Sequence, residues 1–511
     1  MSKPSHRLRR EELKQLRVDR RRAAQKLRRH QVEQGHSARP QAVISNSKSE
    51  WSTVAEERTA RQEAVEGQLQ VFRSALPTLL KQLSRIRDPR NPKTIKHKLT
   101  VVMLYGLLTF VYQMASRREA NQKMSMPVFL HNLQLMFPEL ESLPHHDTLN
   151  RLLSEIEVDA IEQAHVELIR RFIRGKKFER HLVAGCYPIA VDGTQKFARN
   201  RCWDGACLER EVGNKTDEND PSQQYYVYVL EANLAFANGM TLPLASEFLS
   251  YEKGDQERNK QDCELRAFRR LAARIKEYFP RLPIMVLLDG LYANGPVVEL
   301  CRQYHWQFMI VLQDDSLTTV WEESNGLIKI QPGNHLHRCW GNRKQHFSWV
   351  NEIEYRYGNN GRKRQMLHLV VCEESWNEVA VDSGAIVTKT SRHAWISSHA
   401  LNRDNLHERC NLGARHRWAI ESNILVEKQH GYHYEHCFSY NWEAMRGYHY
   451  LMRLGHLINV LAQNSARLVK ICRSRGIRGL IEFLRETCSG PWLDADRIAA
   501  LLASPIQLRL E

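Results

Sequence analysis

The hydrophobic pattern of the chain is helical in its first part. Between residues 51 and 180, apolar residues recur at three- and four-residue spacing, which predicts amphipathic helices. One apolar run, residues 99–115, contains polar side chains and is shorter than the roughly 20 residues of a membrane span. We therefore expect a buried helix there. The predicted helices have two possible roles: a DNA-binding unit, or packing around a catalytic core.

A second pattern, of strands alternating with helices, begins at residue 186. The predicted strands cover 186–193, 223–236, 240–251, 283–290 and 306–313, and the predicted helices cover 262–279 and 296–305. Asn238 and Gly239, between the second and third strands, form a hairpin turn signal. This order predicts a mixed sheet with helices on its faces.

The alternation stops at residue 315. Residues 315–395 are rich in Trp, Thr, Val and Tyr and contain a turn at 358–361, so they predict a mainly β insertion. A strand is expected at 393–398, followed by long helices at 402–429 and 442–471 and by short C-terminal helices. The core would therefore be formed from segments on both sides of the insertion.

The charge and the cysteine content of the chain indicate which kind of partner it binds and in which cell compartment it works. Lys and Arg outnumber Asp and Glu by 74 to 58, and the net charge of +16 suits a polyanion, most often nucleic acid. Residues 1–34 form a basic arm, expected either to stay disordered until it meets phosphates or to form a solvated helix. A linker follows at 36–50. The charged N-terminus gives no secretory signal, and the scattered cysteines indicate reduced thiols, so we expect a cytoplasmic protein with no membrane partner.

Two aspartates follow apolar strands. Asp192 and Asp289 are both predicted at the carboxyl ends of their strands, where ligands of open sheets gather. Two carboxylates brought together repel each other unless a cation lies between them, and Mg²⁺ is the divalent ion that combines carboxylate, water and phosphate ligands. The alternative is that each Asp only caps a turn before Gly193 or Gly290.

A third carboxylate lies on the predicted helix at 402–429. Arg417 and Glu421 are four residues apart and share a helix face, and Lys428 returns to that face two turns further on. A carboxylate between two cations can bind metal while the cations bind DNA phosphates. The alternative is a weak surface salt bridge between Arg417 and Glu421.

This arrangement resembles the cut-and-paste transposases of bacterial insertion sequences, which have an RNase H-like core and a DDE triad. Their signature is Tyr, two residues, Arg, three residues, Glu, six residues and Lys. The sequence matches it at Arg417, Glu421 and Lys428, and departs from it at Ala414, which stands in place of the Tyr. The resemblance covers residues 85–470. It implies an α/β fold: an RNase H-like mixed sheet flanked by helices, with a β-rich insertion and a helical N-terminal region.

The resemblance also implies a site and its partners. Asp192, Asp289 and Glu421 would be the catalytic residues and would hold two Mg²⁺ ions, for which Mn²⁺ can substitute. Arg417 and Lys428 would bind DNA. The partners would be transposon ends and target DNA, and the protein would act as a nucleoid-associated homodimer. The rival functions are a transposase-derived DNA-binding protein that no longer cuts, and another RNase H-like nuclease.

Other residues could also belong to the site, but we rank them below Asp192, Asp289, Glu421, Arg417 and Lys428. Four other acids near the core could replace a member of the triad: Asp204, Asp255, Asp314 and Glu427. The resemblance further implies that a tryptophan of the insertion could stack on a displaced base, although core packing is the simpler role for each of four candidates: Trp321, Trp340, Trp349 and Trp376. Four histidines with no zinc spacing are interpreted as packing and DNA-facing residues: His430, His433, His436 and His449.

The predicted domains follow from these patterns and the resemblance. They are a basic arm with linker at 1–50, a helical and DNA-binding region at 51–180, the catalytic core at 181–314 and 396–471, the insertion at 315–395, and C-terminal helices with a dimerisation role at 472–511.

Overall fold

The computed structural model describes residues 6–35, 49–212, 222–251, 262–380, 383–505 and 507–511. They form two compact units. The first, here the core unit, comprises the described parts of Glu50–Tyr292, Leu300–Gln307 and Glu408–Glu511. The second, here the insertion unit, comprises the described parts of Met1–Ser49, Ala293–Glu299 and Phe308–His407. Both units combine helices with strands, so the chain is of the mixed α/β class with a helical N-terminal region.

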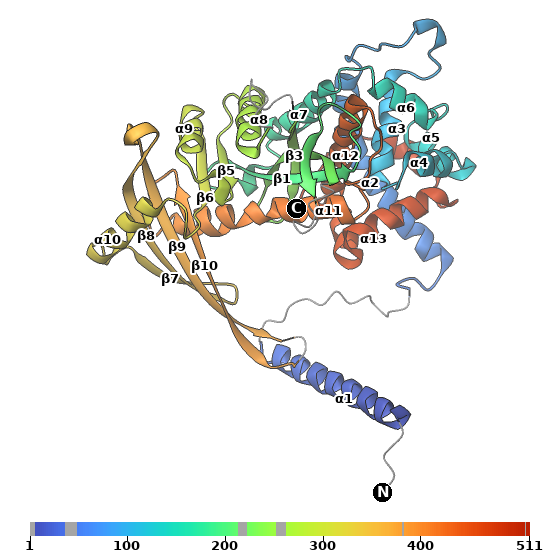
Figure 1. Cartoon of the computed structure of the whole chain (residues 1–511). Coiled ribbons are helices and arrows are strands. Elements are labelled where there is room, and N and C mark those ends of the chain that lie inside the picture. The colour runs from blue at the N-terminus through green and yellow to red at the C-terminus, as the bar shows by residue number, and fades with distance from the viewer. Residues whose placement is uncertain (1–5, 36–48, 213–221, 252–261, 381–382, 506) are drawn as a thin grey trace. The chain divides into compact units, whose positions relative to one another are not determined.

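The sheet of the core unit has the strand order β2-β3-β1-β5, and β4 also pairs with β3 (Figure 1). Its strands are β1 (Tyr187–Arg199), β2 (Leu208–Val212), β3 (Ser222–Ala235), β4 (Thr241–Phe248) and β5 (Ile284–Leu288). β1 is antiparallel to β3 and parallel to β5. The mixed sheet and the hairpin at Asn238 and Gly239 are confirmed, while β2 was not predicted.

The two faces of this sheet carry different side chains because neighbouring residues alternate across a strand. Asp192, Glu231 and Ser246 pair across β1, β3 and β4 and lie on one face. On that face the sheet is covered by α11 (Trp418–Gln429) and α12 (Trp442–Gln463). The opposite face carries Gly193 and Tyr228 and is covered by α8 (Glu264–Tyr278).

The helical region packs around α12. This region comprises α2 (Val54–Leu83), α3 (Leu99–Val111), α4 (Arg117–Met124), α5 (Pro127–Met136), α6 (His146–Leu153) and α7 (Asp159–Arg174). α12 is buried along nearly its whole length, contacting α2, α3, α6 and α7 as well as β4, and α13 (Val469–Ser489) closes the group. Of the two roles left open for this region, packing around the core is therefore observed.

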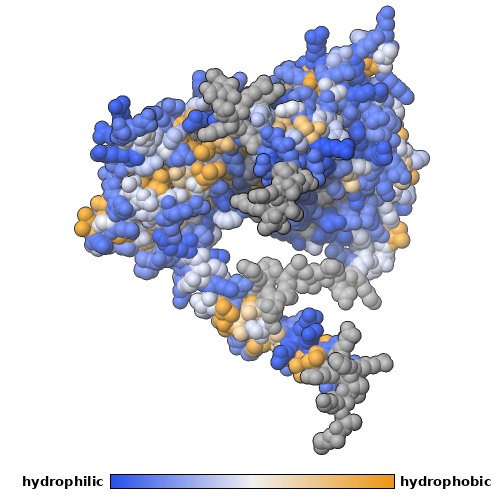
Figure 2. Space-filling model, in the orientation of Figure 1, coloured by the Kyte–Doolittle hydropathy of each residue, from blue (hydrophilic) through white to orange (hydrophobic). Residues whose placement is uncertain are grey.

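α3 is the buried helix expected at 99–115, since all of its residues except Thr100 are buried. No helix in the described part of the chain is long and apolar enough to cross a membrane. Figure 2 shows mostly hydrophilic residues on the face of the core unit that it displays.

The insertion unit is built on long antiparallel strands. They are β6 (Gln307–Val311), β7 (His335–Trp340), β8 (Arg343–Tyr357), β9 (Lys363–Val379) and β10 (Ile386–Ser397). β7, β8, β9 and β10 pair in that order, and β10 also pairs with β6. The prediction of a mainly β insertion is confirmed, but it missed α10 (Thr318–Ile330), which packs on β8.

The basic arm forms a helix, α1 (His6–Glu33), which is one of the two conformations expected for it. Its side chains from Glu11 onward are mostly exposed, and Ala24 is buried where α1 meets the β9–β10 hairpin. Most of the predicted linker, at 36–48, lies outside the described residues.

The prediction of one long helix at 402–429 was wrong. A π-helical turn (His407–Gly413) and a 3-10 turn (Ala414–Arg417) precede α11. Tertiary packing explains the break: a Cβ atom at Gly413 would lie 3.2 Å from Val183 and 3.4 Å from Met285, so the segment lies close against the sheet. The helix predicted at 442–471 likewise ends at Gln463, and α13 begins at Val469.

Asp192 does not end its strand, contrary to the prediction. β1 continues to Arg199 because β3 pairs with it over that length, whereas the described pairing with β5 ends at Ala190.

Candidate active site

The sheet brings Asp192 and Asp289 to the same level of neighbouring strands. In the parallel pair of β1 and β5, Ala190 lies opposite Leu287, and each aspartate is two residues further along. Adjacent strands are about 4.8 Å apart, so the two aspartates are neighbours across β1 and the end of β5. Asp289 follows the last residue of β5, and its Oδ1 accepts a hydrogen bond from the Leu291 amide at 3.0 Å. The turn-capping alternative therefore holds locally for Asp289, but not for Asp192, which lies within a strand.

The electrostatic environment of Asp192 joins it to the other predicted carboxylates. Burial is the largest cause that raises the pKa of Asp192 to about 6. Arg417 opposes this shift, while the negative charges of Glu421 and Asp289 add to it. Two of the carboxylates predicted from the sequence, Asp289 and Glu421, thus act on Asp192, although the three residues come from β1, the residue after β5, and α11.

Arg417 lies in the interior rather than at the surface. Its Nη2 donates to Glu421 Oε1 at 2.6 Å, and its side chain is 6% exposed against 38% for Glu421. The guanidinium lies 4.6 Å from the centre of the Trp418 ring, and its Nε is buried with no hydrogen-bond partner among the described residues. The alternative of a weak surface salt bridge does not describe this pair, because the cation is buried.

Lys428 lies apart from this group. It is in the last turn of α11, where its Nζ pairs with Glu435 at 2.9 Å. Ala414, which stands at the position of the signature tyrosine, is buried in the turn before Arg417.

A second group of charges lies deeper on the same face of the sheet. Glu427, on the same helix as Glu421, accepts from Arg453 Nη1 at 2.9 Å and contacts His456 Nδ1 at 2.6 Å. Arg453 Nη2 also lies 3.3 Å from Glu231. Glu231 additionally accepts hydrogen bonds from Ser246 at 2.6 Å and Tyr434 at 2.7 Å.

This buried network ties α11 to α12 and the sheet. Burial alone would raise the pKa values of Glu231 and Glu427, but the charge of Arg453 and hydrogen bonds from the neighbouring histidines lower both below the ordinary range. Burial lowers the pKa of His449 to about 4, so this histidine is neutral at pH 7 and belongs to the packing, as predicted. Glu427 is thus a structural residue, which supports its low rank as a catalytic candidate.

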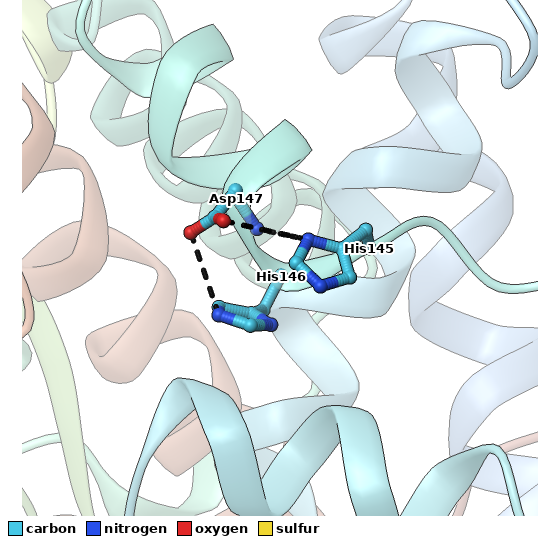
Figure 3. Close-up of side chains that lie close together, drawn as sticks. All are labelled: His145, His146 and Asp147. Carbon is cyan, nitrogen blue, oxygen red and sulfur yellow. Dashed lines mark hydrogen bonds and ion pairs between the residues drawn. The ribbon is translucent and has the colours of Figure 1, made fainter.

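The His145, His146 and Asp147 side chains gather at the start of α6 (Figure 3). His145 Nδ1 accepts from the Asp147 amide at 3.3 Å and caps the helix. Asp147 lies 3.8 Å from Arg117, whose charge opposes a cation there. We interpret this group as a helix cap.

The other candidates have local roles. Asp204 accepts from the Ala206 amide at 3.0 Å in a turn, and Asp314 pairs with Arg392 in the insertion unit. Asp255 lies outside the described residues. Among the tryptophans, Trp349 is 4% exposed and packs in the interior of the insertion unit, as expected. Trp321 and Trp376 are covered by Arg392 at 5.0 Å and Arg343 at 3.9 Å.

The donor set of the site fits a hard divalent cation. Asp192, Asp289 and Glu421 offer only carboxylate oxygens, which are the ligands that Mg²⁺ and Mn²⁺ accept. Burial, and to a lesser extent the charges of Glu421 and Asp289, raise the pKa of Asp192, and a bound cation would favour its ionised form. The unpartnered Nε of Arg417 beside these carboxylates suits an anionic ligand such as a phosphate.

Comparison with known families gives one match. Residues 80–169 match the family described as DDE_Tnp_1-associated. The matched segment runs from the end of α2 through α7, which is the helical region around α12. The match associates this segment of the chain with DDE transposases. No curated protein matches the chain.

Sequence reasoning missed two features near the site. The buried network was not predicted, because its members are spread over more than 250 residues from Lys196 to His456. The carboxylate of Glu264, which lies against Gly193 beside Asp192, was also missed. The glycine directly after Asp192 was the available signal, since a glycine inside a strand often marks a close approach.

Proposed function

We propose that this protein is a DNA transposase with an RNase H-like catalytic core. It would bind the ends of its insertion sequence, cleave DNA strands with the help of divalent metal, and join the ends to target DNA as a homodimer. The proposal goes beyond the coarser association with DDE transposases that residues 80–169 support.

One observation carries the proposal: Asp192 and Asp289 follow paired residues of the adjacent parallel strands β1 and β5, and α11, which carries Glu421, packs on β1. These residues are far apart in sequence and come from separate elements, yet they are the three carboxylates of the predicted triad, of which Glu421 belongs to the spaced signature. A mixed sheet with two such aspartates on adjacent parallel strands supports the RNase H-like assignment.

Each residue has a role in the proposed reaction. Asp192, Asp289 and Glu421 would hold two Mg²⁺ ions, which activate the attacking water or 3′ hydroxyl and stabilise the leaving oxygen. Arg417, buried beside them, would orient a phosphate through its guanidinium and would keep Glu421 directed at the site through their 2.6 Å contact. Lys428 and the excess of positive charge would hold the DNA backbone.

The test is cleavage of a plasmid that carries the DNA flanking this gene, with Mg²⁺ or with EDTA. Wild type is compared with Asp289→Ala and with Asp204→Ala, an acid of the same unit that caps a turn outside the triad. We expect cleavage at the element ends that requires metal and Asp289 but not Asp204.

The alternatives predict different results. Tight binding of the ends without cleavage, even with Mn²⁺ and both ends paired, would favour a transposase-derived DNA-binding protein. Metal-dependent cleavage without preference for the element ends would favour another RNase H-like nuclease.

A further inference from the structure

A fourth carboxylate lies beside the triad, on the opposite face of β1. Glu264 is the first residue of α8 and is half-buried. A Cβ atom at Gly193 would lie 2.7 Å from Glu264 Cδ and Oε1, and 2.7 Å from the Tyr228 ring. Such distances exclude any larger residue at position 193 without movement of Glu264 or Tyr228. The glycine after Asp192 therefore makes room for Glu264, which the turn-capping alternative does not explain.

Two tyrosine hydroxyls hold this carboxylate. Tyr228, on β3, donates to Glu264 Oε1 at 2.5 Å. Tyr292, three residues after Asp289, donates to Oε2 at 3.4 Å. Tyr292 is fully buried and packs against Phe268 of α8, with ring centres 5.0 Å apart. Glu264 thus connects α8 to β3 and to the segment that carries Asp289.

The hydroxyls lie close enough to the triad to interact with its charges. Burial, Glu264 and then Asp192 raise the pKa of Tyr228. Burial, Glu264 and then both Asp289 and Asp192 raise the pKa of Tyr292. Both hydroxyls therefore stay protonated at neutral pH and remain hydrogen-bond donors.

The position of Asp289 depends on contacts from neighbouring side chains more than the position of Asp192 does. Asp192 is fixed within β1 by pairing with Glu231 of β3. Asp289 follows the last residue of β5 and is held locally by its own bond from the Leu291 amide. Tyr292 is the next buried side chain after Asp289, so its bond to Glu264 is placed to fix this segment.

We propose that Tyr228, Glu264 and Tyr292 form a positioning cluster that sets the distance between Asp289 and Asp192, and hence the affinity of the site for divalent metal. The inference rests on the proposed metal-dependent function of that site. Groups that orient metal ligands without touching the metal typically change metal affinity or activity by about 10- to 100-fold when mutated. The cluster performs no proton transfer; it acts only through the aspartates.

The test compares Glu264→Gln and Tyr292→Phe with the control Glu277→Gln, which removes an exposed charge from the same helix. Mn²⁺ binding to metal-free protein is measured by calorimetry, without DNA, together with the Mg²⁺ dependence of end cleavage. We expect both cluster variants to need about 10-fold more metal in each measurement. The control should match wild type. Tyr292→Phe removes only one hydroxyl, so its metal affinity can still be measured if Glu264→Gln fails to fold.

Each outcome separates the inference from the proposed function. Unchanged Mn²⁺ affinity in a folded Tyr292→Phe, with wild type binding metal, would overturn the positioning role whatever happens to cleavage. If the wild-type protein cleaves no DNA but the variants bind Mn²⁺ more weakly than it does, the positioning role of the cluster is supported and the proposed cleavage function is refuted. A wild-type protein that binds no metal would refute both.

Discussion

Two groups of carboxylates share one face of the core sheet and one helix, yet their surroundings are opposite. Asp192 pairs with Glu231 across β1 and β3, and α11 carries both Glu421 and Glu427. Glu231 and Glu427 are fully buried with Arg453 between them, and their pKa values are lowered. Asp192 has one nearby cation, Arg417, and two further carboxylates, and its pKa is raised.

The difference shows how a structural acid can be told from a functional one. A buried carboxylate whose charge is balanced and hydrogen-bonded stabilises the fold it lies in. A cluster of carboxylates with too little positive charge is costly to keep unless a ligand supplies the missing charge. Glu421 and Glu427 are the same residue type on the same helix, but they lie six residues apart and therefore face different surroundings. The predictions below test this distinction.

The largest effect is expected at Glu421. Glu421→Gln should reduce metal-dependent strand cleavage by about 1,000-fold or more, since it removes a proposed metal ligand worth several kcal/mol in the transition state. Its thermal unfolding should stay close to that of wild type. Glu427→Gln, on the same helix, should instead lower the thermal stability of the protein more than Glu421→Gln does. Equal losses of folding in both variants would remove the distinction between the two groups.

Arg453→Leu should destabilise the folded protein by about 3–5 kcal/mol, because it leaves two buried carboxylates without their shared cation. Urea unfolding measures this, with Arg269→Leu on the exposed side of α8 as the control. A loss below about 1 kcal/mol would mean that the network is not structural.

A pH-dependent effect is expected for Asp192. Its pKa rises from 3.8 to about 6 on folding, so the folded state binds the proton more tightly. Its contribution to stability is therefore fully present below pH 3.8 and is lost as the pH rises through about 6. A shift of this size corresponds to at most about 3 kcal/mol.

In EDTA, Asp192→Asn should therefore be more stable than wild type at pH 7 and indistinguishable from it near pH 4. Unfolding free energies measured from pH 4 to 8 test this. Adding Mg²⁺ should stabilise wild type more than the variant. A stability difference that does not change with pH would mean that the charge of Asp192 is not strained in the folded state.

The smallest effect is expected at Lys428, which is paired with Glu435 near the surface. Lys428→Ala should change stability by less than about 1 kcal/mol. If Lys428 binds a phosphate, the slope of log affinity against log salt for end DNA should fall by about one. An unchanged slope would leave Arg417 as the proposed DNA contact on this helix. Deleting residues 1–34 should flatten the same slope further, because the arm carries many cations.

Much of the core was predictable because its signals are local. β3, β4 and β5 coincide with runs of apolar and β-branched residues, and the hairpin between β3 and β4 follows from Asn238 and Gly239. The insertion was recognised as mainly β for the same reason. The helix predicted at 402–429 failed because local spacing cannot register Gly413, whose close packing against Val183 interrupts the helix.

The candidate site likewise has features that the sequence predicts and features that only distant contacts create. The sequence by itself determined which side chains can bind a cation: two aspartates after apolar strands, and a glutamate at fixed spacing from Arg417 and Lys428. Tertiary packing brings the charges of Asp289 and Glu421 to act on Asp192, while Arg453 neutralises Glu427. It also brought Glu264 against Gly193. The physical reason is that a carboxylate's role depends on the charges and burial around it, and these come from residues far away in the chain.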